Sequence, residues 1–309
     1  MVPVTHEDVL AAADRLRGHV HRTPTFSSKA LGERVWFKAE LFQKTGSFKV
    51  RGVLNKLGSL SPEEKARGVI GISAGNHAQA LAWGAAAAGV DCLVVMWRSV
   101  STAKLAATRG YGAAVDLEAD DPAAAFGRLA DLLEQTGRTL VHPFDDPMVI
   151  AGAGTVGLEV VTDAPEAETI LVPGGGGGLV AGIAAALPDR RVVVVEPELS
   201  TAVRSGLEAG ASVPVTPASI ADGLSAPFAG EVALEILRAH EVESVLVSEA
   251  EIEDAFRFLY GRAKLACEPA AAVGLAALRA GKIAPEAVAV VVSGGNVAPE
   301  TASAILAAQ

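Results

Sequence analysis

A lysine, a run of glycines and a short polar segment are the parts of this sequence whose residue types could do chemistry. The lysine is Lys49, which lies between Phe48 and Val50, with Gly46 and Gly52 close by. These apolar neighbours would partly desolvate the amine. Desolvation lowers the pKa of a lysine and raises the neutral fraction that can form an imine with a carbonyl. Most lysines are solvated surface charges, so Lys49 is informative only together with the other two segments.

The glycine run occupies residues 174–178, between an apolar β-branched segment and a helix-like segment at 179–186. Backbone N–H groups at a helix start point outward, and glycines let them approach phosphate oxygens without an obstructing Cβ. A tight turn would need only one or two glycines. The competing interpretation is a dinucleotide fingerprint, because Gly176-x-Gly178-x-x-Ala181 fits its loose form and Glu196 ends the next predicted strand about 20 residues on. That interpretation leaves Lys49 unexplained.

The polar segment at residues 73–77 joins an apolar strand to a helix predicted from Asn76. Its backbone N–H groups, with the Ser73 hydroxyl and the Asn76 amide, could hold a carboxylate at the helix N-terminus. Helix capping by Ser73 or Asn76 is the alternative. His77 is either a general base or a structural histidine. An amine, a phosphate loop and an anion site together indicate an enzyme built around pyridoxal phosphate.

The composition predicts an ordered globular protein. The chain has 309 residues, of which 50% are hydrophobic and 20% charged, and this length favours two lobes because single cores stop growing near ~250–300 residues. The net charge of -10 comes without a basic block, so we expect no nucleic-acid partner. Cys92 and Cys267 lie far apart and are expected to be reduced thiols. His19 and His21 have no metal-ligand spacing and are expected at the surface, and no metal is predicted.

No basic segment followed by an apolar one opens the chain, and no stretch has the ~20 apolar residues of a membrane helix. We therefore expect a cytoplasmic protein.

Short β-branched runs alternate with Ala-rich segments, which predicts a doubly wound α/β fold with mostly parallel sheets. The predicted strands are 35–39, 68–72, 91–96, 113–117, 139–142, 169–172, 191–195, 244–247 and 287–292. The clearest predicted helices are 76–88, 122–135, 150–161 and 251–259.

These segments resemble the fold type II pyridoxal-phosphate enzymes, specifically the group of threonine/serine dehydratases (threonine ammonia-lyases) and serine racemases. The resemblance spans nearly the whole chain. It is carried by Arg22-Thr23-Pro24, Gly46-Ser47-Phe48-Lys49, Ser73-Ala74-Gly75-Asn76-His77-Ala78-Gln79, His142-Pro143-Phe144-Asp145-Asp146-Pro147, the glycine run and Ser293-Gly294-Gly295-Asn296. It implies a two-lobed fold, with a large pyridoxal-phosphate domain of residues 1–67 and 146–309 and a small substrate-closing domain of residues 68–145. It also implies a homodimer.

The resemblance assigns roles to individual residues. Lys49 would carry the cofactor as an imine, with Phe48 beside the ring. Asn76 would bond the 3-hydroxyl and Ser293 would face the pyridine nitrogen. The backbone of the phosphate loop would consist of Gly175, Gly176, Gly177, Gly178 and Leu179. The substrate carboxylate would be held by Ser73, Ala74, Gly75, Asn76 and His77.

The implied activity is β-elimination of L-threonine and/or L-serine to a 2-oxo acid and ammonia, in a catabolic type of enzyme without a regulatory domain. A serine racemase and a dehydratase of another hydroxy amino acid are the alternatives within the family. Racemases of the group have a serine where this chain has Ala74, and metal-binding members have an acidic residue where it has Ala202. From other classes, a nicotinamide oxidoreductase and a non-catalytic ligand-binding protein stay open at this point.

Overall fold

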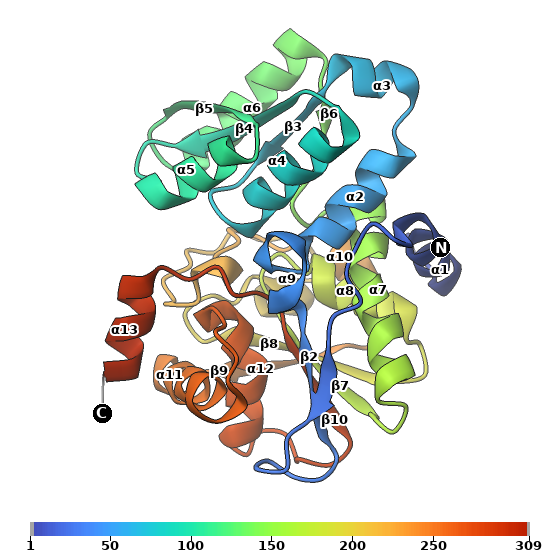
Figure 1. Ribbon diagram of the computed structural model, residues 1–309, viewed down its shortest axis with the longest axis vertical. Coiled ribbons are helices and arrows are strands. Elements are labelled where there is room, and N and C mark those ends of the chain that lie inside the picture. The colour runs from blue at the N-terminus through green and yellow to red at the C-terminus, as the bar shows by residue number, and fades with distance from the viewer. Residues whose placement is uncertain (1–2, 308–309) are drawn as a thin grey trace.

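The computed structural model describes residues 3–307, in which two sheets form the lower and upper parts of the molecule in Figure 1. The lower sheet has six strands in the order β1-β2-β10-β7-β8-β9. Only the β1–β2 pair is antiparallel, and the other neighbours in this sheet are parallel. The six strands are β1 (Thr25–Ser27), β2 (Val35–Ala39), β7 (Thr169–Pro173), β8 (Arg191–Pro197), β9 (Glu243–Val247) and β10 (Val288–Val292).

The upper sheet has four parallel strands in the order β5-β4-β3-β6. These are β3 (Val69–Ile72), β4 (Cys92–Trp97), β5 (Ala114–Ala119) and β6 (Thr139–Leu140). All four lie within residues 68–145, the range expected for the small domain. The doubly wound α/β fold with mostly parallel sheets is confirmed.

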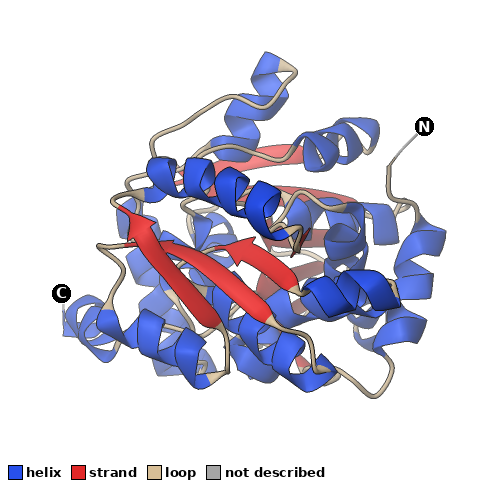
Figure 2. Cartoon of the chain, turned by 90° about the horizontal axis from the view of Figure 1, so that it is seen from above, coloured by secondary structure: helices blue, strands red, loops and turns tan. Residues whose placement is uncertain are grey.

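Helices cover both faces of the sheets, as Figure 2 shows from above. The α-helices are α1 (His6–Leu16), α2 (Lys49–Ser59), α3 (Pro62–Arg67), α4 (Asn76–Ala88), α5 (Thr102–Gly110), α6 (Pro122–Thr136), α7 (Pro147–Asp163), α8 (Gly178–Ala186), α9 (Ala202–Ala209), α10 (Glu231–Ala239), α11 (Glu249–Phe258), α12 (Pro269–Arg279) and α13 (Pro299–Ala307). Short helical turns are η1 (Glu40–Phe42), η2 (Lys44–Gly46), η3 (Asp222–Leu224) and η4 (Leu259–Ala263). None of the helices within residues 3–307 has the length and apolar character needed to cross a membrane.

Strand β8 shows why the lower sheet is buried on both faces. Val192 and Val194 lie in one core with residues of α7, α8 and α10, whereas Val193 and Val195 lie in a second core with residues of α11 and α12. Successive side chains of a strand point to opposite faces, so a strand covered on both sides needs an unbroken apolar run. The sequence of β8 supplies that run.

Differences from the expected elements have local causes. The strand β1 was not predicted, and it is a three-residue antiparallel edge strand. The strand β6 ends at Leu140 instead of 142, because the ring of His142 accepts a hydrogen bond from the backbone of Asp145 and starts a turn. The helix α7 begins at Pro147 instead of 150, because the Asp146 side chain accepts from two backbone N–H groups and caps it.

Candidate active site

A cavity of about 580 Å³ lies where residues of the two sheets' carboxyl ends meet. Ser73 follows β3, Gly174 follows β7 and Ser293 follows β10, so the cavity has the position at which open α/β sheets bind ligands. The lining includes every residue that the sequence predicted for the site: Phe48, Lys49, Ser73, Ala74, Gly75, Asn76, His77, Gly175, Gly176, Gly177, Gly178, Leu179 and Ser293.

Lys49 is the first residue of α2 and is half-buried, with its amine directed to the cavity wall. Its Nζ donates a hydrogen bond of 2.7 Å to the carbonyl of Pro143, which lies on the segment that leaves the upper sheet. Burial lowers the pKa of Lys49 to about 8, and the negative charge of Glu268 opposes this effect. A substantial neutral fraction is therefore present near pH 8, as a nucleophilic lysine requires.

The loop before Lys49 is paired with the loop after β10. The backbone N–H of Phe48 donates to the carbonyl of Ser293 (3.1 Å), and that of Gly295 donates to the carbonyl of Gly46 (2.9 Å). Gly46 has a φ of 74° and Thr45 one of 61°, a left-handed conformation that is uncommon for threonine. This pairing holds Ser293, which is only 4% exposed, beside the start of α2.

The glycine run forms the start of α8. Gly177 has a φ of 91°, which favours glycine, and Gly178 opens the helix. A Cβ on Gly176 would come within 2.2 Å of the Phe144 ring, and one on Gly178 within 2.6 Å of the Phe144 carbonyl oxygen. Phe144 therefore packs against a surface that only glycines can form. The first N–H groups of α8 have no partner inside the helix and face the same cavity as Lys49.

The polar segment before α4 leaves the N-terminus of that helix uncapped. The N-cap is Gly75, which makes no side-chain cap, and the Ser73 hydroxyl instead accepts from the N–H of Gly75 at 3.1 Å. The capping alternative for Ser73 and Asn76 is therefore wrong. A second helix N-terminus opens on the cavity, where its dipole favours an anion.

His77 has the contacts of a structural histidine. It is 2% exposed, and its Nε2 lies 2.9 Å from the carbonyl of Val141. Burial, together with the charge of Lys49, lowers the pKa of His77 to about 3. The ring is consequently neutral near pH 7 and is a weak base. His19 and His21 are exposed, as expected.

The cavity lining also includes Lys104, Phe144, Asp222 and Glu268, for which the sequence alone predicted no role in the site. Lys104 of α5 and Asp222 of η3 form an ion pair of 2.6 Å across the two parts of the molecule. Glu268 is 4% exposed, and its Oε1 accepts from Nδ2 of Asn76 at 2.7 Å. Burial raises the pKa of Glu268 to about 7.

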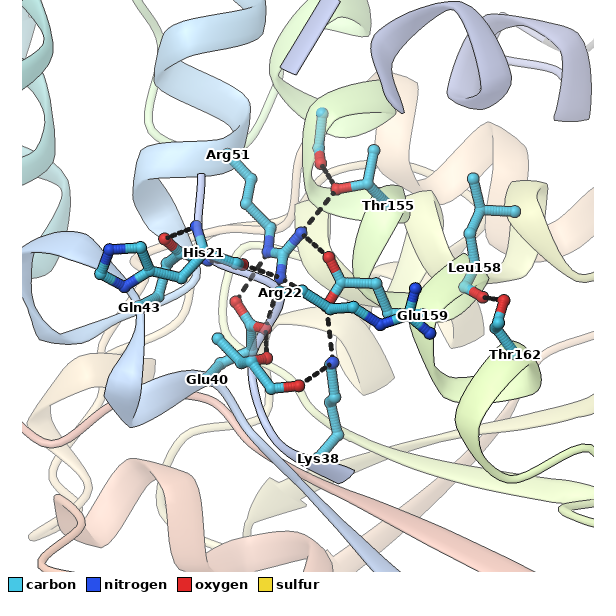
Figure 3. Close-up of polar contacts among 12 residues, drawn as sticks. His21, Arg22, Lys38, Glu40, Gln43, Arg51, Thr155, Leu158, Glu159 and Thr162 are labelled. Atoms are coloured by element: carbon cyan, nitrogen blue, oxygen red, sulfur yellow. Dashed lines mark hydrogen bonds and ion pairs between the residues drawn. The ribbon is translucent and has the colours of Figure 1, made fainter. Parts of the chain in front are cut away.

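Behind Lys49, a buried charge cluster anchors the first turn of α2 (Figure 3). The guanidinium of Arg51 donates to both carboxylate oxygens of Glu40 at 2.8 Å and to those of Glu159 at 2.8 and 2.9 Å. Lys38 donates to Glu159 at 2.6 Å. The two cations balance the two anions, so the cluster ties α2 to β2 and α7 without leaving an unpaired charge. The position of Lys49, two residues earlier, is thereby fixed.

Glu196 is fully buried, and its carboxylate accepts the backbone N–H groups of Val203 and Arg204 at 2.8 Å each, at the start of α9. It is therefore not free to bind a ribose. Burial raises its pKa to about 7, against the effect of these hydrogen bonds. Within residues 3–307, no three His, Cys, Asp or Glu side chains are grouped so that they could hold a metal ion.

Comparison with known proteins identifies the family. The family model described as pyridoxal-phosphate dependent enzyme matches residues 16–294, and the chain belongs to this family. The cofactor is therefore pyridoxal phosphate, and the chain's own residues fit it: an amine of lowered pKa, a glycine-lined helix start and a second helix start share one cavity. The predicted family and fold type II architecture are confirmed.

Within this family, the chain is similar to threonine ammonia-lyases and to a serine racemase. An L-threonine ammonia-lyase of Thermotoga maritima is 40% identical over 304 residues, covering 95% of this chain and 76% of the relative. A catabolic L-threonine dehydratase of Escherichia coli K12 is 38% identical over 310 residues, covering 96% and 94%. Among solved structures, a serine racemase of maize superposes with a TM-score of 0.91 at 33% identity, covering 96% and 95%. A threonine deaminase of T.th. superposes with a TM-score of 0.88 at 38% identity, covering 95% and 99%.

Proposed function

We propose that this chain is a threonine/serine ammonia-lyase, which converts L-threonine and/or L-serine to a 2-oxo acid and ammonia. The observation that carries the proposal is the meeting of Lys49, the glycine start of α8 and the uncapped start of α4 in one cavity. The sequence relatives support the choice of reaction, because they are named as threonine ammonia-lyases or dehydratases at 38–42% identity over most of the chain.

The proposed residue roles follow from the donors and acceptors of the cavity. N–H groups at the start of α8 would bind the phosphate, and those at the start of α4, with Ser73, would bind the substrate carboxylate. Ser293 would offer its uncharged hydroxyl to the pyridine nitrogen. The bound cofactor withdraws electrons from the α-carbon of the substrate. Nζ of Lys49 accepts the α-proton, because its pKa of about 8 leaves neutral amine available near pH 7 to 8.

In the overall reaction Nζ of Lys49 takes the α-proton, the β-hydroxyl leaves with one proton as water, and Nζ gives up the proton that it took, so the enzyme returns to its starting state. The enamine product then takes up a water molecule and releases ammonia, so the atoms balance without an oxidant or reductant. His77 takes no proton in this scheme, since burial keeps it neutral, and it holds the segment of residues 73–77 against Val141.

Serine racemisation is the second candidate, because the maize serine racemase superposes closely on this chain. A racemase must deliver a proton to the opposite face of the α-carbon. Ala74 lines the cavity at the position where racemases of the group carry a serine, and its methyl group has no proton to give. We therefore consider β-elimination the better supported of the two reactions.

The test is a substrate panel with the purified holoprotein. L-Threonine, L-serine and other hydroxy amino acids are incubated with it, while oxo-acid release and change of chirality are measured in parallel. We expect oxo acid and ammonia in equal amounts from threonine or serine, and none from a Lys49→Ala variant. Lys29→Ala, at an exposed lysine, is the matched control. Chirality change of serine without oxo acid would refute the proposal.

We further propose a division into domains, an oligomeric state and a cellular location. The domain division is residues 1–67 and 146–309 for the cofactor and 68–145 for closing over the substrate, and the ion pair between Lys104 and Asp222 joins the two. The protein is proposed to be a cytoplasmic homodimer whose partner is a small amino acid, with no nucleic-acid partner. Support comes from the family resemblance and from a net charge of -10 without a basic block. Light scattering of the holoprotein tests the dimer.

A further inference from the structure

Glu268 is the buried carboxyl of the cavity that has no part in the proposed scheme. It immediately precedes α12, and its backbone N–H donates to the carbonyl of Gly294, beside the loop that holds Ser293. Its side chain lines the cavity and is 4% exposed. Oε1 accepts from Asn76, whereas Oε2 makes no hydrogen bond with the described residues. Burying a carboxyl raises the free energy of the folded protein, and this cost indicates a functional role for Glu268.

Glu268 is one end of a chain of hydrogen bonds through two amides. Nδ2 of Asn296 donates to the Thr45 carbonyl and to Oδ1 of Asn76, each at 2.8 Å, while Nδ2 of Asn76 donates to Glu268 at 2.7 Å. The Thr45 carbonyl can only accept, which fixes the amide of Asn296 and, through its bond to Oδ1, that of Asn76 in one orientation. One N–H of Asn76 then points to Glu268, and its second N–H is left to donate to a ligand.

The charged groups around Glu268 come from three other elements. Lys49 of α2 and Lys104 of α5 favour its carboxylate, whereas Asp222 of η3 opposes it. The effect on Lys49 is reciprocal, because the charge of Glu268 holds up the pKa of that amine against burial. No direct ion pair joins Glu268 and Lys49, since Nζ of Lys49 donates to Pro143. Both side chains line the same cavity, so the charge of one acts on the other across it.

We propose that Glu268 is a positioning residue of this enzyme, which directs the free N–H of Asn76 to the cofactor and whose charge acts on the Lys49 amine across the cavity that both side chains line. The inference rests on the proposed cofactor contacts of Asn76 and Lys49. It adds a carboxyl that acts through its two neighbours, Asn76 and Lys49. Glutamine at this position keeps the acceptor for Asn76 and removes the charge, whereas alanine removes both.

Capture of cofactor by the cofactor-free protein measures both effects without any substrate. Pyridoxal phosphate is added between pH 6 and 10, and the growth of bound-cofactor absorbance gives a rate at each pH. Only the neutral amine attacks, so the wild-type rate should rise with a midpoint near 8. In Glu268→Gln we expect the midpoint to fall by roughly one pH unit, because a nearby negative charge favours the protonated amine. Cofactor affinity should change less than about threefold, since the hydrogen bond is kept.

In Glu268→Ala we expect the same fall of the midpoint and, in addition, a loss of cofactor affinity of about tenfold or more, because a hydrogen bond to a charged acceptor is removed. Glu243→Gln is the matched control, at an exposed glutamate paired with Arg191. It should leave midpoint and affinity unchanged. Circular dichroism checks the fold of each variant, and Glu268→Gln alone decides the charge effect if the alanine variant does not fold.

An unchanged midpoint in Glu268→Gln overturns the charge effect, and wild-type affinity in a folded Glu268→Ala overturns the positioning of Asn76. Neither result bears on the reaction itself. If the wild-type protein captures cofactor but turns over no hydroxy amino acid, the proposed function fails while the inference on Glu268 stands.

Discussion

Replacing Lys49 by methionine should stabilise the cofactor-free protein. Methionine keeps an unbranched apolar side chain of similar length and removes the charge that the fold must bury. Burial lowers the pKa of Lys49 from its usual 10.5 to about 8. Since a change of one in pKa corresponds to about 1.4 kcal/mol, holding the charged amine costs the folded protein about 3 kcal/mol. The lost hydrogen bond to the Pro143 carbonyl offsets about 1 kcal/mol of the gain. The net expectation is about 2 kcal/mol at pH 7.

The dependence on pH separates this cause from better packing. Below about pH 8 the amine is protonated in both the folded and the unfolded chain, so the wild-type protein bears the full free-energy cost of burying the charged amine. Between about 8 and 10.5 the unfolded chain binds more protons, and the wild-type protein therefore gains stability as pH rises. The advantage of Lys49→Met should shrink and then reverse over this interval, so that near its upper end the wild-type protein is more stable by about 1 kcal/mol, the contribution of its hydrogen bond to Pro143. Urea unfolding at several pH values measures it, with Lys29→Met at an exposed lysine as control. A constant difference between pH 7 and 10.5 would refute the reasoning.

Three further outcomes are expected. Gly176→Ala should lower the free energy of unfolding by about 1–3 kcal/mol in urea and weaken cofactor binding, because its Cβ would come within 2.2 Å of the Phe144 ring; unchanged values would contradict this contact. Arg51→Met should cost about 3–5 kcal/mol in the same assay, because the buried Glu40 loses its cationic partner and Glu159 keeps only Lys38, whereas Arg34→Met at the surface should cost less than about 0.5 kcal/mol. Activity should withstand EDTA, since within residues 3–307 no three His, Cys, Asp or Glu side chains are grouped so that they could hold a metal ion; a loss of ammonia release that added Mg²⁺ restores would disprove it.

The site residues that could be predicted from the sequence are those recognisable from their immediate neighbours along the chain. These are Lys49 between apolar residues, the glycines before α8 and the serine after β10. The parallel strands then bring them together, because their carboxyl ends share an edge of the sheet. The doubly wound fold was predictable for a similar reason, since a strand such as β8, covered on both faces, must be an unbroken apolar run.

The remainder depends on contacts between distant residues. Asn76 and Glu268 are hydrogen-bonded although 192 positions separate them, and 118 positions separate Lys104 from Asp222. No local pattern marks such a pair, and the sequence around Glu268 indicates only a helix start with proline at its first turn. His77 shows the same limit, because its structural role follows from the Val141 carbonyl, which lies 64 positions away.

The position of β10 in the six-stranded sheet has a consequence for folding during synthesis on the ribosome. Strands β1 and β2 are joined to β7, β8 and β9 only through β10, which consists of residues Val288–Val292. A ribosome must therefore synthesise almost the whole chain before the first and middle parts of this sheet can be united. The four-stranded sheet, whose strands lie between Val69 and Leu140, can form much earlier. We expect the nascent chain to complete its four-stranded sheet first and to complete the cavity only when Ser293 emerges.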